Sequence, residues 1–169
     1  MKKEVCVITG GGSGMGLAAA KYMPKEKIIL VTGRTLAKLE RAVTELQEAG
    51  YEAYAKTCDT SVRSQVQELA AYAAELGEIK NVIHAAGLSP AMADPEKLLR
   101  VNALGTVYIN QEFSKYMKAG SVIVDISSNS AYMIPGFLAK KKTFTLADTD
   151  EDLFLKKCLK LPKMLKDDY

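Results

Sequence analysis

The sequence predicts a doubly wound α/β fold, in which parallel strands alternate with helices through the first 126 residues. Three observations lead to this prediction. Short, continuous apolar runs such as Val5-Cys6-Val7-Ile8 are typical of strands that are covered on both faces. Longer helix-like stretches follow these runs and end at a proline or a glycine, as helices do. A glycine-rich turn joins the first apolar run to the first helix-like stretch.

The expected strands and helices follow one another in strict alternation. Strands are expected at residues 5–8, 27–32, 51–57, 81–84 and 122–126. The first three helices are expected at residues 14–23, 35–49 and 62–76, and they stop at Pro24, Gly50 and Gly77. A fourth helix begins at Pro95 behind the cap residue Asp94 and runs to about Met117. Right-handed crossovers between parallel strands then place helices on both faces of one sheet.

The pattern changes after Asn129. Residues 131–142 contain a Pro-Gly pair and end in three lysines, which predicts a loop. Thr149, with Asp152 three residues later, resembles a capping box and predicts a short helix that Pro162 interrupts. This last segment therefore looks like a helical excursion and not another strand–helix unit.

Composition excludes several classes of protein. The chain has 169 residues, 48% of them hydrophobic and 25% charged, which suits one globular domain with a substantial core. A net charge of +3 with scattered lysines and arginines predicts no nucleic-acid or membrane partner. Cys6, Cys58 and Cys158 have unrelated spacings and His84 is the only histidine, so we expect reduced thiols and no metal site. The N-terminal apolar run is too short for a signal peptide, and we expect a cytoplasmic protein with His84 as a core residue bonded to backbone.

The turn after the first strand has the composition of a phosphate-binding loop. Glycine lets the backbone approach a ligand closely, and a helix N-terminus offers free N–H groups that suit a pyrophosphate. A turn needed only for tight strand–helix packing is the alternative interpretation. The candidate cofactor residues in this turn are Gly10, Gly12, Ser13, Gly14, Met15 and Gly16.

The spacing Thr-Gly-x-x-x-Gly-x-Gly, together with three later motifs, resembles the short-chain dehydrogenase/reductase family in its single-domain branch. These motifs are Asp59 after the third strand, His84-Ala85-Ala86-Gly87 in place of Asn-Asn-Ala-Gly, and Asn102 within Val-Asn-Ala. The resemblance covers residues 1 to about 130. It implies a Rossmann-like sheet in the order 3-2-1-4-5 that lacks the family's last strands. It also implies a dinucleotide-binding domain at 1–128, with residues 129–169 as a loop and helical insertion of the same domain.

The resemblance also implies roles for these motifs: Asp59 contacts adenine, Ala85, Ala86 and Gly87 line the cofactor, and Asn102 belongs to the active site. The second strand ends in Thr32-Gly33-Arg34, with no carboxylate for a ribose 2′-hydroxyl. A guanidinium can bind a 2′-phosphate in a bidentate manner, so Arg34 favours NADP(H) over NAD(H). A solvated residue at a helix start is the alternative for Arg34.

By resemblance, Ser128 is the active-site serine that holds the substrate oxygen. The family's acid is a tyrosine with a lysine four residues later, and no tyrosine of this chain has that partner. Tyr169 lies 41 positions after Ser128, the gap expected of a branch resembling bacterial 3-alpha-hydroxysteroid dehydrogenase/carbonyl reductase, whose helical insertion falls there. Tyr169 is therefore either the active-site tyrosine or a polar tail residue. Tyr132 is a weaker candidate for the acid.

The expected function is hydride transfer between NADP(H) and a small carbonyl or alcohol substrate, weak or absent in this chain because the tyrosine–lysine pair is not intact. The alternative is a non-catalytic nucleotide-binding or dimerising fragment. A sugar-nucleotide epimerase is disfavoured because that branch usually has Thr-Gly-x-x-Gly-x-x-Gly. Branch resemblance implies a hydrophobic ketone such as a steroid. The apolar strand at 122–126 would form an exposed edge, so we expect either an incomplete chain or a homo-oligomer.

Overall fold

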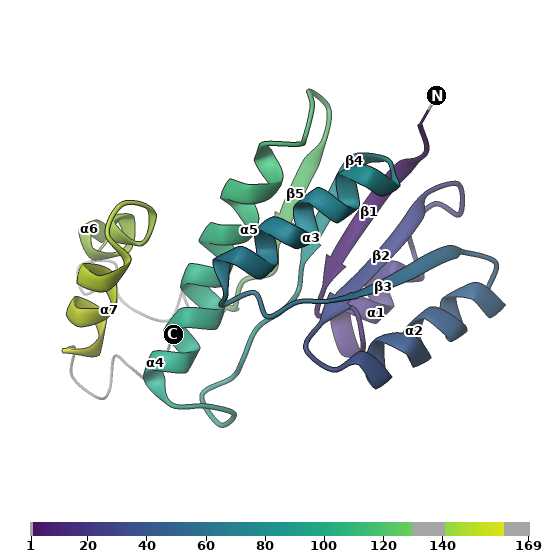
Figure 1. Ribbon diagram of the computed structural model, residues 1–169. Coiled ribbons are helices and arrows are strands. Elements are labelled where there is room, and N and C mark those ends of the chain that lie inside the picture. Colours follow the sequence, from purple (N-terminus) through teal and green to yellow (C-terminus); the bar gives the residue numbers. More distant parts are fainter. Residues whose placement is uncertain (1, 130–140, 161–169) are drawn as a thin grey trace. The chain divides into compact units, whose positions relative to one another are not determined.

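The computed structural model describes residues 2–129 and 141–160. Its centre is a five-stranded parallel sheet in the order β3-β2-β1-β4-β5 (Figure 1). The predicted fold class and strand order are therefore confirmed. The strands are β1 (Glu4–Thr9), β2 (Ile28–Gly33), β3 (Glu52–Thr57), β4 (Glu78–His84) and β5 (Val122–Asp125).

Helices cover both faces of the sheet, as crossover connections require. They are α1 (Gly14–Ala20), α2 (Leu36–Glu48), α3 (Arg63–Leu76) and α5 (Gly105–Ser114). Helices α1 and α2 lie on one face, and α3 and α5 lie on the other (Figure 1). On the first face, alternate strand residues such as Cys6, Ile8 and Ile29 form one buried cluster with Leu39 and Leu46 of α2. The period of two in the strands and the apolar stripe of α2 together build this core.

Most boundaries in the first half of the chain lie within one residue of the sequence prediction, but two differ by three residues. Helix α1 ends at Ala20, three residues before Met23, because the residue before a proline disfavours helical conformation and Pro24 follows. Strand β4 begins at Glu78 instead of Asn81, because the Glu78 amide donates to the Lys3 carbonyl at 2.9 Å and so pairs the two strands from their first residues.

The predicted long helix after Asp94 is interrupted by a π-helical segment. It comprises α4 (Pro95–Leu98), the π-helical η1 (Leu99–Leu104) and α5, which ends at Ser114 and not near Met117. The Asp94 carboxylate accepts the Lys97 amide, so the predicted cap is confirmed. Within η1 the Asn102 carbonyl accepts the Thr106 hydroxyl at 2.8 Å, a side-chain bond that periodicity does not reveal.

The described residues form two compact units. The first comprises 2–86 and 108–126, and therefore holds the whole sheet. The second comprises 87–107 with 127–129 and 141–160. The domain boundary expected at 128 stays a prediction.

Within the second unit, three short helical elements follow one another: α6 (Lys141–Phe144), the 3₁₀ helix η3 (Thr145–Asp148) and α7 (Glu151–Leu159). The Phe144 and Phe154 rings meet edge to face at 5.9 Å. The predicted capping box was wrong by one residue, because Asp150 and not Thr149 caps α7 by accepting the Leu153 amide. The loop predicted at 131–142 lies largely outside the described residues, but its end is wrong, since α6 begins at Lys141.

Among the described helices, none combines the length and the apolar character that crossing a membrane requires. The described ranges also contain no group of three histidine, cysteine, aspartate or glutamate side chains placed to hold a metal ion.

Candidate nucleotide-binding and active site

The glycine-rich turn packs tightly against its own helix and against the end of β4. Gly10 has a φ of +66°, and a Cβ there would lie 2.9 Å from the Ala85 carbonyl oxygen. A Cβ on Gly16 would lie 2.5 Å from the Gly10 carbonyl oxygen. Both distances are shorter than a side chain tolerates, so only glycine fits these two positions. Helix α1 can therefore start directly above the end of β1.

The other side of the same turn is open. Gly14 has a φ of +55°, and a Cβ there would meet no described atom within 4 Å. Ser13 is the N-cap of α1, with extended backbone, and its side chain makes no capping hydrogen bond. The first amides of α1 are thus not capped by Ser13, and the neighbouring Met15 side chain is exposed. An anion such as a phosphate suits uncapped amides at a helix start.

Thr9, the last residue of β1, ties the turn to the segment after β4. Its hydroxyl accepts the Ala86 amide at 3.0 Å and lies 2.7 Å from Nδ1 of His84. The Ala85 amide donates to the Thr9 carbonyl at 3.3 Å. His84 is a core residue as expected, but its partner is the Thr9 side chain and not backbone. Burial holds the pKa of His84 below its usual range, against an opposing effect of Asp125.

Arg34 and Asp59 lie on adjacent segments at the carboxyl ends of β2 and β3. Arg34 is exposed between Gly33 and the start of α2. The Cys58 amide donates to the Gly33 carbonyl at 2.9 Å, which holds the two segments together. Asp59 is half-buried, and its Oδ1 accepts both the amide and the hydroxyl of Ser61, at 3.0 and 2.6 Å. Its second oxygen, Oδ2, accepts no hydrogen bond from the described residues and can serve a ligand.

Asn102 has a clear local role in the second unit. Its side chain makes two 2.8 Å hydrogen bonds with the backbone of Leu88, donating from Nδ2 and accepting at Oδ1. A Cβ on Gly87 would lie 3.5 Å from that Oδ1. Asn102 thus fixes the segment that follows the Ala85-Ala86-Gly87 motif. Ser128 is exposed after β5, whereas Tyr132 and Tyr169 lie outside the described residues, so their predicted roles stay predictions.

Sequence reasoning missed two residues of this site. The motif spacing includes Thr9 without assigning it a role, although a threonine at the end of a buried strand signals a hydroxyl that needs a partner. Ser61 is not among the predicted site residues, although Asp-x-Ser after a strand is the signature of an Asx turn. Its two bonds to Asp59 orient that carboxylate.

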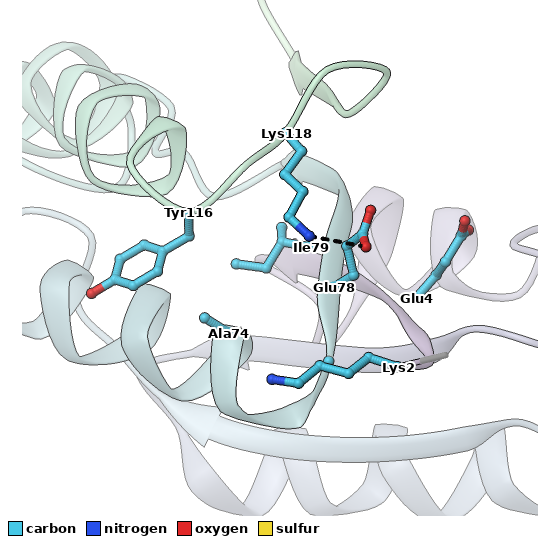
Figure 2. Close-up of a pocket in the computed structure, with 8 residues that line it drawn as sticks. Lys2, Glu4, Ala74, Glu78, Ile79, Tyr116 and Lys118 are labelled. Atoms are coloured by element: carbon cyan, nitrogen blue, oxygen red, sulfur yellow. Dashed lines mark hydrogen bonds and ion pairs between the residues drawn. The ribbon is translucent and has the colours of Figure 1, made fainter.

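A surface pocket lies at the opposite end of the sheet. Figure 2 shows Lys2, Glu4, Glu78, Tyr116 and Lys118 around it, with an ion pair between Glu78 and Lys118. The side-chain bond from Lys80, followed by the charge of Lys118, holds the pKa of Glu78 below its usual range. Ligands of open α/β sheets bind beyond the carboxyl ends of the strands, whereas this pocket adjoins the amino ends of β1 and β4. It is therefore separate from the candidate site.

A parallel sheet in this order, with a glycine turn after its first strand, defines the class of doubly wound nucleotide-binding folds. The family model of the short chain dehydrogenases matches residues 4–139. The chain belongs to the short-chain dehydrogenase/reductase family.

Three known proteins illustrate the relationship. The short-chain dehydrogenase/reductase bsc3 of Alternaria brassicicola is 31% identical over 134 residues, which cover 79% of this chain and 48% of the relative. An actinorhodin polyketide ketoreductase variant solved with NADPH is 26% identical, with a TM-score of 0.68 over 86% of this chain and 60% of that one. The 3-oxoacyl-[acyl-carrier protein] reductase of Brucella melitensis, solved with NAD, shares the fold at 23% identity, with a TM-score of 0.70 over 80% and 59% of the two chains. The chain spans about half the length of the curated relatives it matches.

Proposed function

We propose that this chain binds NADP(H) at the carboxyl ends of β1, β2, β3 and β4. The observation that carries the proposal is the two-sided turn after β1, which is packed at Gly10 and Gly16 and open at Gly14. The diphosphate would lie on the open side, against the amides of Ser13, Gly14 and Met15. Gly12 belongs to the same turn, where a Cβ would contact the start of α2 at 3.3 Å.

The remaining cofactor contacts follow the segments next to this turn. Asp59 Oδ2 would accept from the adenine amino group, and Ala85, Ala86 and Gly87 would lie along the cofactor beyond the end of β4. Arg34 would bind the 2′-phosphate, because its exposed guanidinium offers paired donors and no carboxylate precedes it. One solved relative is in complex with NADPH and another with NAD, so the preference for NADP(H) rests on Arg34.

The chemistry proposed for the complete site is hydride transfer between the nicotinamide and a small carbonyl or alcohol compound. Ser128 would hold the substrate oxygen, Asn102 would position the neighbouring segment, and Tyr169 would donate the proton. A phenol has a pKa of about 10 and needs a nearby cation to act near neutrality. Since none of the seven tyrosines before Tyr169 has a lysine four residues later, we propose very low turnover for these 169 residues alone.

The first seven tyrosines have no lysine four residues later, which favours a second candidate function. The chain would then bind the nucleotide, or pair with another protein, without reducing a substrate. Val122 and Val124 of β5 are about half exposed, which fits a homo-oligomer that covers this strand. Light scattering on the purified chain distinguishes a monomer from such an assembly.

A fluorescence titration tests the proposed cofactor site. We expect saturable NADPH binding that is tighter than NADH binding, and Arg34→Ala should weaken NADPH about tenfold or more while leaving NADH nearly unchanged. Arg41→Ala, on the helix α2 that follows Arg34, is the matched control. No NADPH binding by the folded chain would refute the proposal, and equal losses for both nucleotides would refute the role of Arg34. A ketone panel with NADPH oxidation as the readout tests turnover.

A further inference from the structure

A row of polar side chains crosses the sheet just before the proposed cofactor turn. The strand register places Thr32 of β2, Thr9 of β1, His84 of β4 and Asp125 of β5 as successive neighbours. Because side chains directly opposite each other in register share one face, these four residues lie on the face covered by α3 and α5. Thr9, Thr32 and His84 are buried. A buried polar row of this kind is costly unless its hydrogen bonds are satisfied.

Counting hydrogens identifies the form of His84. The Thr9 hydroxyl accepts the Ala86 amide and also has one hydrogen of its own to donate. Among the described residues, the acceptor within reach of that hydrogen is His84 Nδ1, 2.7 Å from the Thr9 oxygen. Nδ1 is therefore unprotonated and the proton of the neutral ring lies on Nε2. The opposite tautomer would leave the Thr9 hydrogen unpaired as well as Nε2, which is buried without a partner in either case. One unsatisfied group is less costly than two.

We propose that neutral His84 is a positioning residue of the cofactor site: by accepting the Thr9 hydroxyl hydrogen, it aims the Thr9 oxygen at the Ala86 amide and so fixes the Gly10 turn against the 85–87 segment. Protonated His84 would donate from Nδ1 to the Thr9 oxygen, which can still accept the Ala86 amide with its second lone pair, but the hydrogen of the Thr9 hydroxyl would then be buried with no acceptor among the described residues. The Gly10 turn would then be held less firmly against the 85–87 segment, and nucleotide binding would weaken as His84 takes up a proton. This inference rests on the proposed cofactor site.

The charged groups around His84 influence the pH at which its ring takes up a proton. Asp125 on β5 is the charged neighbour whose field favours protonation, and its own Oδ2 accepts from Asn110 of α5 at 2.9 Å. Arg63 at the start of α3 and Glu112 of α5 form an ion pair at 3.0 Å and offset each other. Thr9 and Thr32, on the strands beyond, carry no charge. Lys56, at the β3 end of the row, packs against Tyr72 and lies three strands away.

The free protein gives the first test, and it does not depend on nucleotide binding. Because His84 is the only histidine, long-range ¹H–¹⁵N correlation spectra of the ring need no assignment. We expect the Nε2-protonated tautomer near pH 7.5. On acidification, the Ala86 amide resonance should shift with the same midpoint as the ring, and the distant Ala74 amide should not. A proton on Nδ1 at pH 7.5, or an Ala86 amide resonance that does not shift as the His84 ring is protonated, would overturn the inference.

The second test compares two substitutions by calorimetric titration with NADP⁺. His84→Asn presents an amide oxygen where Nδ1 lies but cannot titrate, and His84→Leu removes the acceptor. At pH 8 we expect the Asn variant to bind within about twofold of the natural chain and the Leu variant to bind about five- to tenfold more weakly. When the pH is lowered to one unit below the ring midpoint, the natural chain should lose about five- to tenfold more affinity for NADP⁺ than the Asn variant does. Because the phosphate of the ligand titrates equally for both proteins, the Asn variant also corrects for that effect.

These outcomes separate the two proposals. Parallel pH profiles for the natural chain and His84→Asn, or equal affinity of His84→Leu and His84→Asn at pH 8, would overturn the positioning role. Absence of NADP⁺ binding by the natural chain at pH 8 would instead refute the cofactor site. In that case the tautomer and the Ala86 resonance still decide whether His84 holds the turn in place.

Discussion

Strands β1 and β5 are both apolar and β-branched, yet their surroundings differ. The side chains of β1 from Val5 to Ile8 are fully buried, whereas Val122 and Val124 of β5 are 50% and 48% exposed. Strand β1 pairs with β2 and β4 and has helices over both faces, whereas β5 pairs with β4 alone among the described strands (Figure 1). An apolar sequence thus indicates that a strand can be buried, but the neighbouring strands and helices decide whether it is buried.

The face on which β5 is exposed can be identified. Val122 and Val124 are in register with Asn81 and Ile83, and Ile83 packs against the cluster on the α1 and α2 side. On the opposite face, the Asp125 side chain accepts from Asn110 of α5. The exposed apolar surface of β5 therefore lies on one side of the sheet, beyond the part that α1 and α2 cover.

A matched pair of valine truncations gives the largest expected contrast between the two strands. Val7→Ala should lower the free energy of unfolding by about 2–3 kcal/mol, because it removes buried methyl groups and leaves a cavity. Val124→Ala should cost less than about 1 kcal/mol, because half of that side chain is already in water. Urea unfolding followed by circular dichroism measures both. Equal losses would mean that β5 is covered in solution.

The glycine turn at the end of β1 allows a second comparison, between a crowded and an open position of the same turn. Gly16→Ala should cost about 1–3 kcal/mol of stability, because the new methyl group would collide with the Gly10 carbonyl. Gly14→Ala should cost about 1 kcal/mol, since the space is open and only the left-handed backbone is strained. Thermal unfolding ranks the two variants. A larger loss for Gly14→Ala would contradict the two-sided description of the turn.

Acid should weaken the centre of the sheet through His84. Burial is the main influence that lowers its pKa in the folded chain, with Asp125 opposing it, so the unfolded chain takes up the proton first as pH falls. The contribution of the neutral ring is complete above the unfolded pKa of about 6.5 and is lost as pH falls from there through the folded pKa. The urea midpoint should decrease between pH 7.5 and a pH below 6, and this decrease should be larger for the natural chain than for His84→Asn. An identical fall would remove His84 as the cause.

The smallest expected change in stability comes from placing a charge on β5. Val124→Lys should alter the free energy of unfolding by less than about 0.5 kcal/mol in a monomer, because the side chain can extend into water. It should nevertheless reduce any self-association, since an edge lysine opposes strand pairing. Light scattering across a concentration series provides the measurement. Unchanged association would show that β5 is not the contact surface.

Much of the fold was predictable from the sequence, because the signals are local. The apolar run at Val5, the glycine at Gly50 and the proline after Asp94 each specify a strand, a helix end or a helix start within a few residues. The order of the strands came from the family resemblance and not from these signals. The shift of the α7 cap to Asp150 was not predictable, because threonine and aspartate are both good caps one residue apart.

The candidate site was predictable as a set of motifs but not as a set of contacts. Thr9 and His84 are 75 positions apart in the chain, so their hydrogen bond depends on the alignment of β1 with β4. The crowding at Gly16 comes from the Gly10 backbone, and the role of Asn102 comes from the Leu88 backbone. Such close approaches arise only when the chain has folded. The motif spacing indicates where they occur but not which atoms meet.

The central claim is that the turn after β1 seats the diphosphate of a dinucleotide. Amide resonances of the ¹⁵N-labelled chain, followed during titration with NADPH, test it most directly. The account predicts saturable shifts at residues 10–16, at Arg34 and Asp59 and along 85–87, with the pocket residues Glu78 and Lys118 unchanged. Shifts confined to Glu78 and Lys118, or a turn that does not respond in the folded protein, would contradict it.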